Sequence, residues 1–213
     1  HGYLDWWPVC LGFNNLEPPF NDPEIRRAVN YAIDRDQLVA IGWQGAGTKS
    51  HLPLPDFPPM RKFTDQIQDL VEKYEIGVFD PAKSAAIMER KGYAKDAEGF
   101  WAKDGERIKI VIDIFDVFTD LAPVMAAQFK QVGFDASFRM TSDVFSRMAQ
   151  GVARSFLMGN GGSVRDPYFT MRLYHSRFVQ PTGTHAERFW RWSNPEYDAL
   201  VDQMGQTAPD DPE

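Results

Sequence analysis

The sequence predicts an α/β domain with a mixed sheet, a central strand–helix–strand (βαβ) unit and helices on both faces. Three patterns within residues 108–140 carry this prediction. Apolar and polar residues alternate over 108–114, apolar residues recur at helical spacing over 121–132, and alternation returns over 134–140. Because the links are short, the two strands are expected to run parallel with a right-handed crossover.

An extended segment and a capped helix open the chain. Residues 1–17 are rich in aromatic side chains and predict a strand that crosses into the domain. Asp22 is expected to cap a helix, because its carboxylate can accept hydrogen bonds from the free amides of the first turn. Pro23 suits the first helical position, and an apolar stripe at helical spacing continues over 25–33.

A second helix is expected directly afterwards. Asp34 and Gln37 have the spacing of a capping box, and Gly42 is expected to end the helix. Residues 42–63 are rich in glycine and proline and are predicted to form an ordered loop. Residues 64–78 have apolar side chains at helical spacing.

A further helix and a hairpin precede the βαβ unit. Asp80 and Pro81 predict the start of the helix, and Gly92 its end. Residues 94–107 are predicted to form a hairpin that turns at 103–105.

The last third of the chain is expected to contain three helices and one strand. The first helix would be capped by Thr141 or Ser142, and a strand is expected at 154–159. The other two helices would begin at Asp166-Pro167 and at Asn194-Pro195, as do those at Asp22-Pro23 and Asp80-Pro81. Residues 175–193 are expected to be loop. The apolar side chains expected to point inward are Val144, Phe145 and Met148 in the first of these helices, and Leu200, Val201 and Met204 in the last.

Composition and charge narrow the function classes. The chain has 213 residues, 43% of them hydrophobic and 25% charged, as in an ordinary globular domain. The formal net charge of −7 disfavours nucleic acid and anionic membrane as partners. Cys10 is the only cysteine, so no internal disulfide or cysteine metal cluster is expected.

Patterns that carry catalysis are missing from the sequence. Cys10 lies in an apolar segment without a nearby base, and Gly161-Gly162-Ser163 lacks the closing glycine of a nucleophile elbow. His51 has no second histidine at ligand spacing, so a zinc site is not expected. His175 and His185 are expected to be solvated loop residues. The sequence therefore favours a binding protein without enzyme activity, metal or cofactor.

A longer pattern carries a resemblance to a known family. It comprises Phe13-Asn14, Pro18-Pro19-Phe20, Asp22, the run 26–35, and the helix start at 194–198. This pattern resembles that of the family 5 solute-binding proteins of bacterial ABC importers. The similarity extends over roughly residues 11–41, 79–93 and 108–204 and is weakest in 42–78 and 175–193.

The resemblance implies a fold, a role and a location. Residues 1–213 would form a single lobe of the periplasmic-binding-protein type II fold, the C-terminal ligand-binding lobe of a larger two-lobe protein, and both chain ends look like cuts. The lobes would close on a small solute, an oligosaccharide or oligopeptide, for delivery to a membrane ABC permease. One lobe alone would bind weakly. The location would be periplasmic or extracellular, membrane-associated through the transporter.

Two other classes of function remain open. One is a solute-sensing regulatory domain, which a DNA-binding domain in the full-length gene would support and a secretory signal would oppose. The other, less favoured, is a hydrolase of the same ligands, which a turnover assay with peptide and oligosaccharide substrates would reveal.

The loop 160–165 is the predicted ligand site. In peptide-binding members an acidic residue three positions before the acid of the next helix pairs with the peptide amino group, and the resemblance puts Ser163 there. Residues 155–165 contain no carboxylate, which favours an oligosaccharide over a peptide. Trp7 and Trp192 are further candidate cleft residues. The predicted ligand-binding residues are Asn160, Gly161, Gly162, Ser163, Arg165, Tyr168, Trp190 and Trp6.

The alternative for this loop is purely structural. Its glycines would then form a tight turn, Asp166 would only cap its helix, and the tryptophans would belong to the core.

Overall fold

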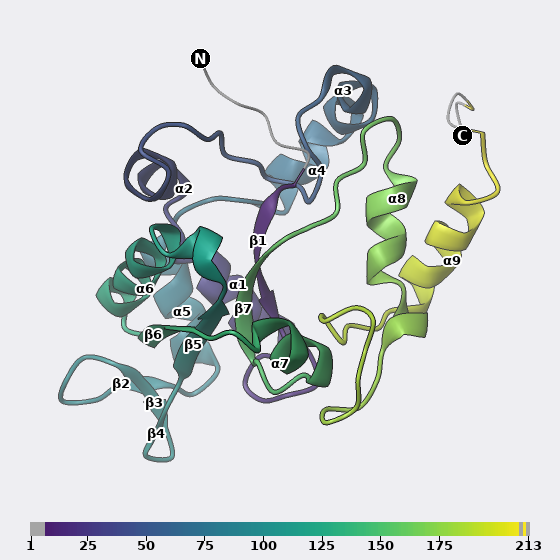
Figure 1. Cartoon of the computed structure of the whole chain (residues 1–213). Coiled ribbons are helices and arrows are strands. Elements are labelled where there is room, and N and C mark those ends of the chain that lie inside the picture. Colours follow the sequence, from purple (N-terminus) through teal and green to yellow (C-terminus); the bar gives the residue numbers. More distant parts are fainter. Residues whose placement is uncertain (1–6, 209–210, 212–213) are drawn as a thin grey trace.

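A four-stranded mixed sheet organises the protein, whose computed structural model describes residues 7–208 and 211 (Figure 1). The strand order is β1 (Val9–Phe13), β7 (Ser155–Gly159), β5 (Lys109–Ile114) and β6 (Asp135–Met140). β5 runs parallel to both β6 and β7, whereas β1 pairs antiparallel with β7. The predicted α/β class and mixed sheet are confirmed.

The βαβ unit forms as predicted. α6 (Leu121–Val132) links the two strands and ends at Gly133, whose φ of +107° is a conformation that glycine adopts readily. β5 is an inner strand and β6 an edge strand, so the unit occupies one half of the sheet. Asp120 precedes α6 and makes no side-chain capping bond, although aspartate is a favoured residue at this position. The core of this half contains Ile110, Ile112, Ile114, Phe129 and Phe134, all 0% exposed.

The two N-terminal helices are positioned by their caps. α1 (Pro23–Tyr31) begins after Asp22, and α2 (Arg35–Gln37) begins after Asp34. Each carboxylate accepts a first-turn amide, at 2.9 and 3.0 Å respectively. The chain continues from α2 as a π-helix, Leu38–Gly42. Both aspartate caps are therefore confirmed, but the Asp34 amide donates to the Gln128 side-chain oxygen at 3.2 Å, so only the Asp34 half of the predicted capping box forms.

Part of the predicted loop is helical. α3 (Pro58–Thr64) begins six residues before the expected helical segment, and a 3₁₀ turn (Asp65–Ile67) joins it to α4 (Gln68–Lys73). Pro58 and Pro59 occupy the first turn of α3, where a backbone N–H has no partner within the helix, so proline loses no hydrogen bond there. The prolines therefore begin a helix at a place where their number predicted a loop.

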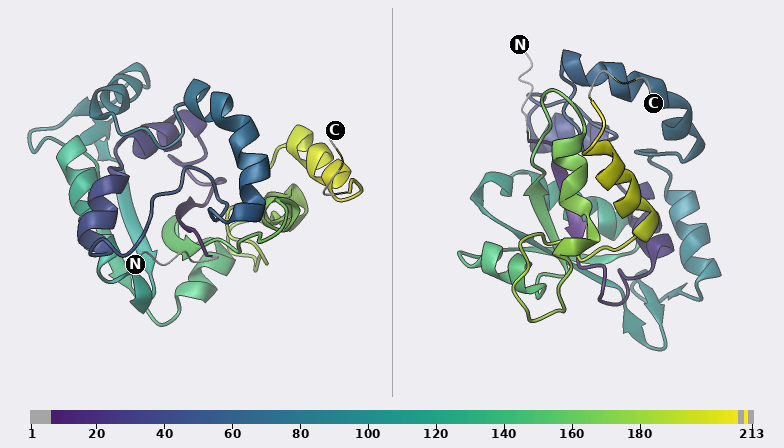
Figure 2. Two further views of the ribbon diagram at one scale, coloured as in Figure 1. Left: turned by 90° about the horizontal axis from the view of Figure 1, so that it is seen from above. Right: turned by 90° about the vertical axis from the view of Figure 1, so that its right-hand side faces the viewer.

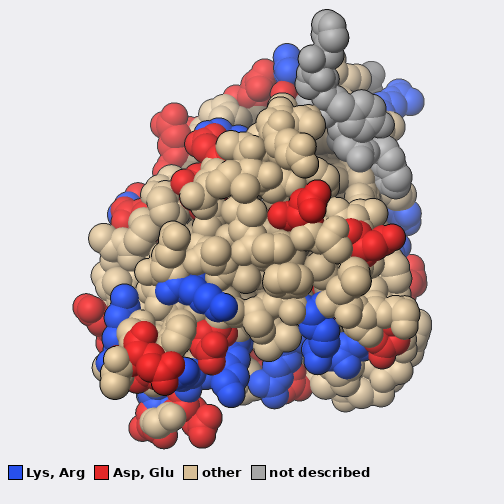
Figure 3. Space-filling model, turned by 60° about the vertical axis from the view of Figure 1, so that its left-hand side comes forward, with Lys and Arg blue, Asp and Glu red and all other residues tan. Residues whose placement is uncertain are grey.

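A small second sheet lies below the main one. α5 (Pro81–Arg90) leads into β2 (Ala94–Lys95), β3 (Trp101–Lys103) and β4 (Glu106–Arg107). The predicted hairpin is β3 with β4, and β2 adds a third strand. Basic and acidic residues intermingle at this lower end of the surface, and Arg107 pairs there with Asp96 and Glu98 (Figure 3).

Three helices complete the chain, α7 (Val144–Gln150), α8 (Tyr168–Met171) and α9 (Pro195–Met204). α8 and α9 lie together on the opposite side of β1 and β7 from α6 (Figures 1 and 2). In the part of the chain that the structure describes, no helix has the length and apolar character needed to cross a bilayer.

Some residues of α7 and α9 do not point inward as predicted. Phe145, Leu200 and Met204 are 51%, 64% and 36% exposed, whereas Val201 is buried. α9 begins after Asn194, which caps it as predicted, but it contacts its neighbours along a narrow stripe. α7 has no side-chain cap from Thr141 or Ser142.

Candidate ligand cavity

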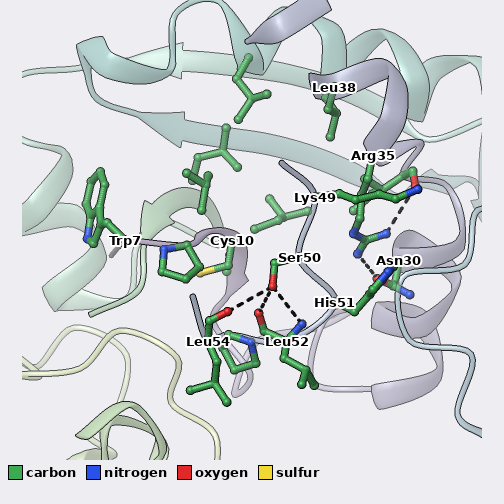
Figure 4. A pocket seen from close by; sticks show the side chains of 18 of the residues that line it. Trp7, Cys10, Asn30, Arg35, Leu38, Lys49, Ser50, His51, Leu52 and Leu54 are labelled. Carbon is green, nitrogen blue, oxygen red and sulfur yellow. Dashed lines mark hydrogen bonds between the residues drawn. The ribbon is translucent and has the colours of Figure 1, made fainter. Parts of the chain in front are cut away.

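A cavity of about 1080 Å³ lies between the two helical sides of the protein, beside β1. Its lining comes from β1, α1, the π-helix, the start of α6, and the C-terminal helices. The segment 46–56 runs across it (Figure 4). Because separate parts of the chain converge here around a space of ligand size, this cavity is the candidate functional site.

One wall of the cavity is aromatic and rests on β7. The indole of Trp7 stacks on Phe118 with ring centroids 6.0 Å apart and an angle of 16° between the planes. A Cβ added to Gly159 would lie 1.8 Å from the Trp7 ring. The indole therefore packs directly against the strand backbone, which only glycine permits.

A second aromatic wall rests on β1. Trp190 stacks on Tyr174 with centroids 5.4 Å apart. A Cβ on Gly12 would approach the Trp190 ring to 2.4 Å, so this strand also needs glycine under an indole.

Tyr197 joins α9 to α8 at the same wall. Its hydroxyl donates a hydrogen bond of 2.7 Å to the Met171 carbonyl. Burial, with a smaller effect of Asp198, raises the pKa of Tyr197 to about 12, and burial raises that of Tyr174 well above its ordinary value. Both phenols are therefore neutral at physiological pH.

The end of the cavity near α1 and α2 is polar. The Arg35 guanidinium donates hydrogen bonds to the Asn30 side-chain oxygen, at 2.6 Å, and to the Ile33 carbonyl, at 3.5 Å. Arg26 lines the same end and donates 2.6 Å to the Phe20 carbonyl. Burial lowers the pKa of both guanidinium groups. Figure 4 shows Arg35 and Asn30 on the opposite side of the cavity from Trp7.

The segment 46–56 is held by its own hydrogen bonds. The Ser50 hydroxyl donates to the Leu52 and Leu54 carbonyls at 2.7 and 3.3 Å (Figure 4). Lys49 pairs with Asp36 at 2.8 Å, which ties the segment to α2. These contacts make the segment a wall of the cavity.

Cys10 also lines the cavity, but it is not a nucleophile. Its thiol donates a weak hydrogen bond to the Met158 carbonyl at 3.3 Å. Burial raises the pKa of Cys10 to about 12, so almost no thiolate exists at neutral pH. Its position fits binding rather than covalent catalysis.

Only part of the predicted site faces this cavity. Trp190 lines it, together with Trp7 and Trp192. Asn160 is 2% exposed and donates 3.4 Å to the Pro53 carbonyl, behind the cavity wall. Trp6 lies outside the residues that the structure describes.

The loop 160–165 braces β7 against α8. Ser163 is 1% exposed, and its hydroxyl accepts the Thr170 amide at 2.9 Å, while the Thr170 hydroxyl accepts the Ser163 amide at 2.8 Å. The Thr170 hydroxyl donates to the Gly161 carbonyl at 2.9 Å, and Gly162 is buried beside them. The polar groups of this loop are therefore largely used within the protein.

The remaining predicted residues lie away from the cavity lining. Arg165 is exposed, and the half-buried Tyr168 lies so close to Gly205 that a Cβ there would come within 2.9 Å of its ring. Asp166 accepts the Tyr168 amide at 3.1 Å, as expected of a helix cap.

Sequence reasoning missed the polar end of the cavity. The apolar stripe over 25–33 leaves Asn30 on the other face of α1, and no sequence pattern assigns Arg35 to a site. Their contact depends on the angle between the two helices, which neither helix pattern encodes. The one available signal was that Arg26 and Asn30 are four residues apart and so share a helix face.

The family model described as "Bacterial extracellular solute-binding proteins, family 5 Middle" matches residues 3–181. Heme-binding protein A of Haemophilus influenzae is 26% identical over 197 residues, covering 91% of this chain and 32% of the relative. The chain thus spans about a third of the length of this relative.

Two solved structures share the fold. The periplasmic oligopeptide-binding protein of Thermotoga maritima with bound mannohexaose has a TM-score of 0.84 at 20% identity, covering 96% of this chain and 40% of the other. The oligopeptide-binding protein AppA of Bacillus subtilis in complex with a nonapeptide has a TM-score of 0.74 at 19% identity, covering 97% and 40%.

Proposed function

The chain belongs to the bacterial extracellular solute-binding proteins of family 5, and from this premise we propose that it is part of the solute-capturing component of an ABC importer. That component binds a small solute and delivers it to a membrane permease. The observation that carries the proposal is the cavity of about 1080 Å³, which has two aromatic walls and one polar end. No enzymatic step is part of this role.

The chain would act as one lobe of a longer protein. Relatives matched over most of this chain are about three times its length, since it covers 32% and 33% of two of them. We propose that residues 1–213 form the C-terminal ligand-binding lobe and that a second lobe closes over the solute. The whole protein would work in the periplasm or outside the cell, beside its permease.

The cavity favours a neutral or acidic solute over a free peptide amino terminus. Among the described residues, Asp56 is the only carboxylate that lines it, and Asp56 is paired with Arg61 at 2.8 Å. A desolvated ammonium group needs a countercharge that this lining does not offer. Tryptophan and tyrosine rings suit the apolar faces of sugars, so an oligosaccharide is the favoured ligand and an oligopeptide the alternative.

A thermal-shift screen of the full-length protein tests this function. A solute that binds only the folded state raises the melting temperature. We expect a rise with members of a panel of cello-, xylo- and galacto-oligosaccharides and of their acidic, uronate-bearing counterparts, and little change with oligopeptides. A rise with peptides that have a free amino terminus, lost when that amine is acetylated, would overturn the ligand preference. Turnover of either panel would contradict a role in binding alone.

A further inference from the structure

The polar end of the cavity has a positive charge that the residues described by the structure do not neutralise. The cationic side chains in the described lining are Arg26, Arg35 and Lys49. Lys49 is neutralised by Asp36 at 2.8 Å, and the pKa of Arg26 is partly restored by the charge of Asp22. For Arg35 the structure shows no carboxylate within ion-pair distance in residues 7–208.

The Arg35 guanidinium also has donors to spare. It carries five N–H groups, of which the Asn30 oxygen and the Ile33 carbonyl accept two. Its Nε has no hydrogen-bond partner among the described residues, and it is not sealed from solvent. Because the side chain lines the cavity, this donor is available to a solute there.

Asn30 fixes the direction of this group. Its side-chain oxygen accepts 2.6 Å from Arg35 Nη2, so one edge of the guanidinium plane is anchored to α1. A planar group held at one edge presents its remaining N–H donors as a fork, the geometry that binds a carboxylate or a similar oxyanion with two hydrogen bonds.

We infer that Arg35, oriented by Asn30, binds the acidic group of a solute whose apolar part lies against the aromatic walls. The charge of this end contrasts with the formal net charge of −7 of the whole chain, so the cation is a local feature of the cavity. The inference rests on the proposed function, because it assigns a ligand class to the same cavity.

A matched pair of fluorescent probes tests the charge preference on the full-length protein. Anilinonaphthalene sulfonate carries an anionic group on an aromatic body, and phenylnaphthylamine has nearly the same body without the charge. Arg35→Met should weaken binding of the sulfonate by roughly tenfold and leave the neutral probe within about twofold. Arg27→Met is the control, since Arg27 lies on α1 outside the cavity lining and bonds the exposed Tyr74 carbonyl.

A competition on the unmodified protein gives a second readout if Arg35→Met does not fold. Naphthoate should displace the bound sulfonate probe, and a roughly tenfold higher concentration of naphthamide should be needed for the same displacement. Equal displacement by acid and amide, or equal loss of both probes in Arg35→Met, would overturn the inference while the proposed function stands. Binding of neither probe would remove the cavity as a ligand site and so defeat both.

Discussion

Two desolvated arginines show how the same group is used differently in two regions of this protein. Burial lowers the pKa of both Arg191 and Arg35, and the structure shows a carboxylate partner for neither of them within its described residues. Arg191 is 2% exposed, and its two terminal nitrogens donate at 2.6–3.3 Å to four backbone carbonyls, those of Met148, Ala149, Thr184 and Phe189. Arg35 lines the cavity with two acceptors.

The two arginines differ in whether their N–H donors are enclosed by the protein or accessible from the cavity. At Arg191 the carbonyls of the α7 end and of the following loop surround both terminal nitrogens, and only Nε, which is sealed from solvent, lacks a partner. At Arg35 the protein supplies fewer acceptors and leaves an open space beside them. A guanidinium enclosed by carbonyls and sealed from solvent indicates a stabilising role, whereas one with accessible spare donors in a cavity indicates recognition.

The largest effect is expected at Arg191. Arg191→Met would remove the donor of the Thr184 and Phe189 carbonyls, whereas those of Met148 and Ala149 keep backbone amides, and each unsatisfied buried acceptor costs about 1–3 kcal/mol. We expect the free energy of unfolding to fall by about 3 kcal/mol or more, measured by urea denaturation. Arg35→Met should cost less than about 1 kcal/mol in the same experiment. If both variants lost the same free energy of unfolding, the two arginines would not have the different roles that we assign to them.

The aromatic walls should respond separately from the polar end. Gly159→Ala would place a carbon 1.8 Å from the Trp7 ring and displace it, at a cost of about 1–3 kcal/mol for overpacking. Both fluorescent probes should then bind more weakly, whereas Arg35→Met affects only the acidic one. Gly161→Ala is the matched control, because its added carbon meets Leu173 and Phe169 at an ordinary 3.4 Å. If Gly161→Ala weakened binding as much, the predicted loop site would regain support.

Ser163→Ala separates bracing from ligand contact in the loop 160–165. The change removes one of the two acceptors of the buried Thr170 amide, which also donates to the Pro167 carbonyl at 3.1 Å, so the free energy of unfolding should fall by about 1 kcal/mol. Affinity for solute should stay within about twofold, as measured by calorimetry on the full-length protein. A large loss of affinity at unchanged stability would instead place the Ser163 hydroxyl on the ligand.

The smallest effect concerns Tyr197 and alkaline pH. Its folded pKa is raised to about 12 by burial, above the ordinary value of about 10, so the folded state favours the neutral phenol. Its contribution is fully present below pH 10 and is lost as the pH rises toward 12. Tyr197→Phe should remove the bond to Met171, cost about 1 kcal/mol at neutral pH, and flatten the decline in stability between pH 10 and 12. An unchanged alkaline decline would show that Tyr197 ionises freely in the folded protein.

Sequence patterns predicted the elements that depend on neighbouring residues. The caps at Asp22, Asp34 and Asn194 and the βαβ unit all follow from local chemistry, and the structure confirms them. The resemblance to family 5 was also right.

The cavity could not be predicted from local sequence patterns. It requires two indoles to rest on glycines of different strands and Asn30 to meet Arg35 across a helix junction, and these contacts depend on tertiary packing. For the same reason helical spacing alone placed Phe145 and Leu200 inward, because it shows that a helix has an apolar face but not whether anything covers it.

The most direct test of the account is a crystal structure of the full-length protein with the solute that stabilises it most. We expect the solute in the cavity, its apolar face on Trp7 or Trp190 and an acidic oxygen within 2.7–3.2 Å of the Arg35 guanidinium. A solute bound instead on the loop 160–165, with the cavity left to water, would contradict the account.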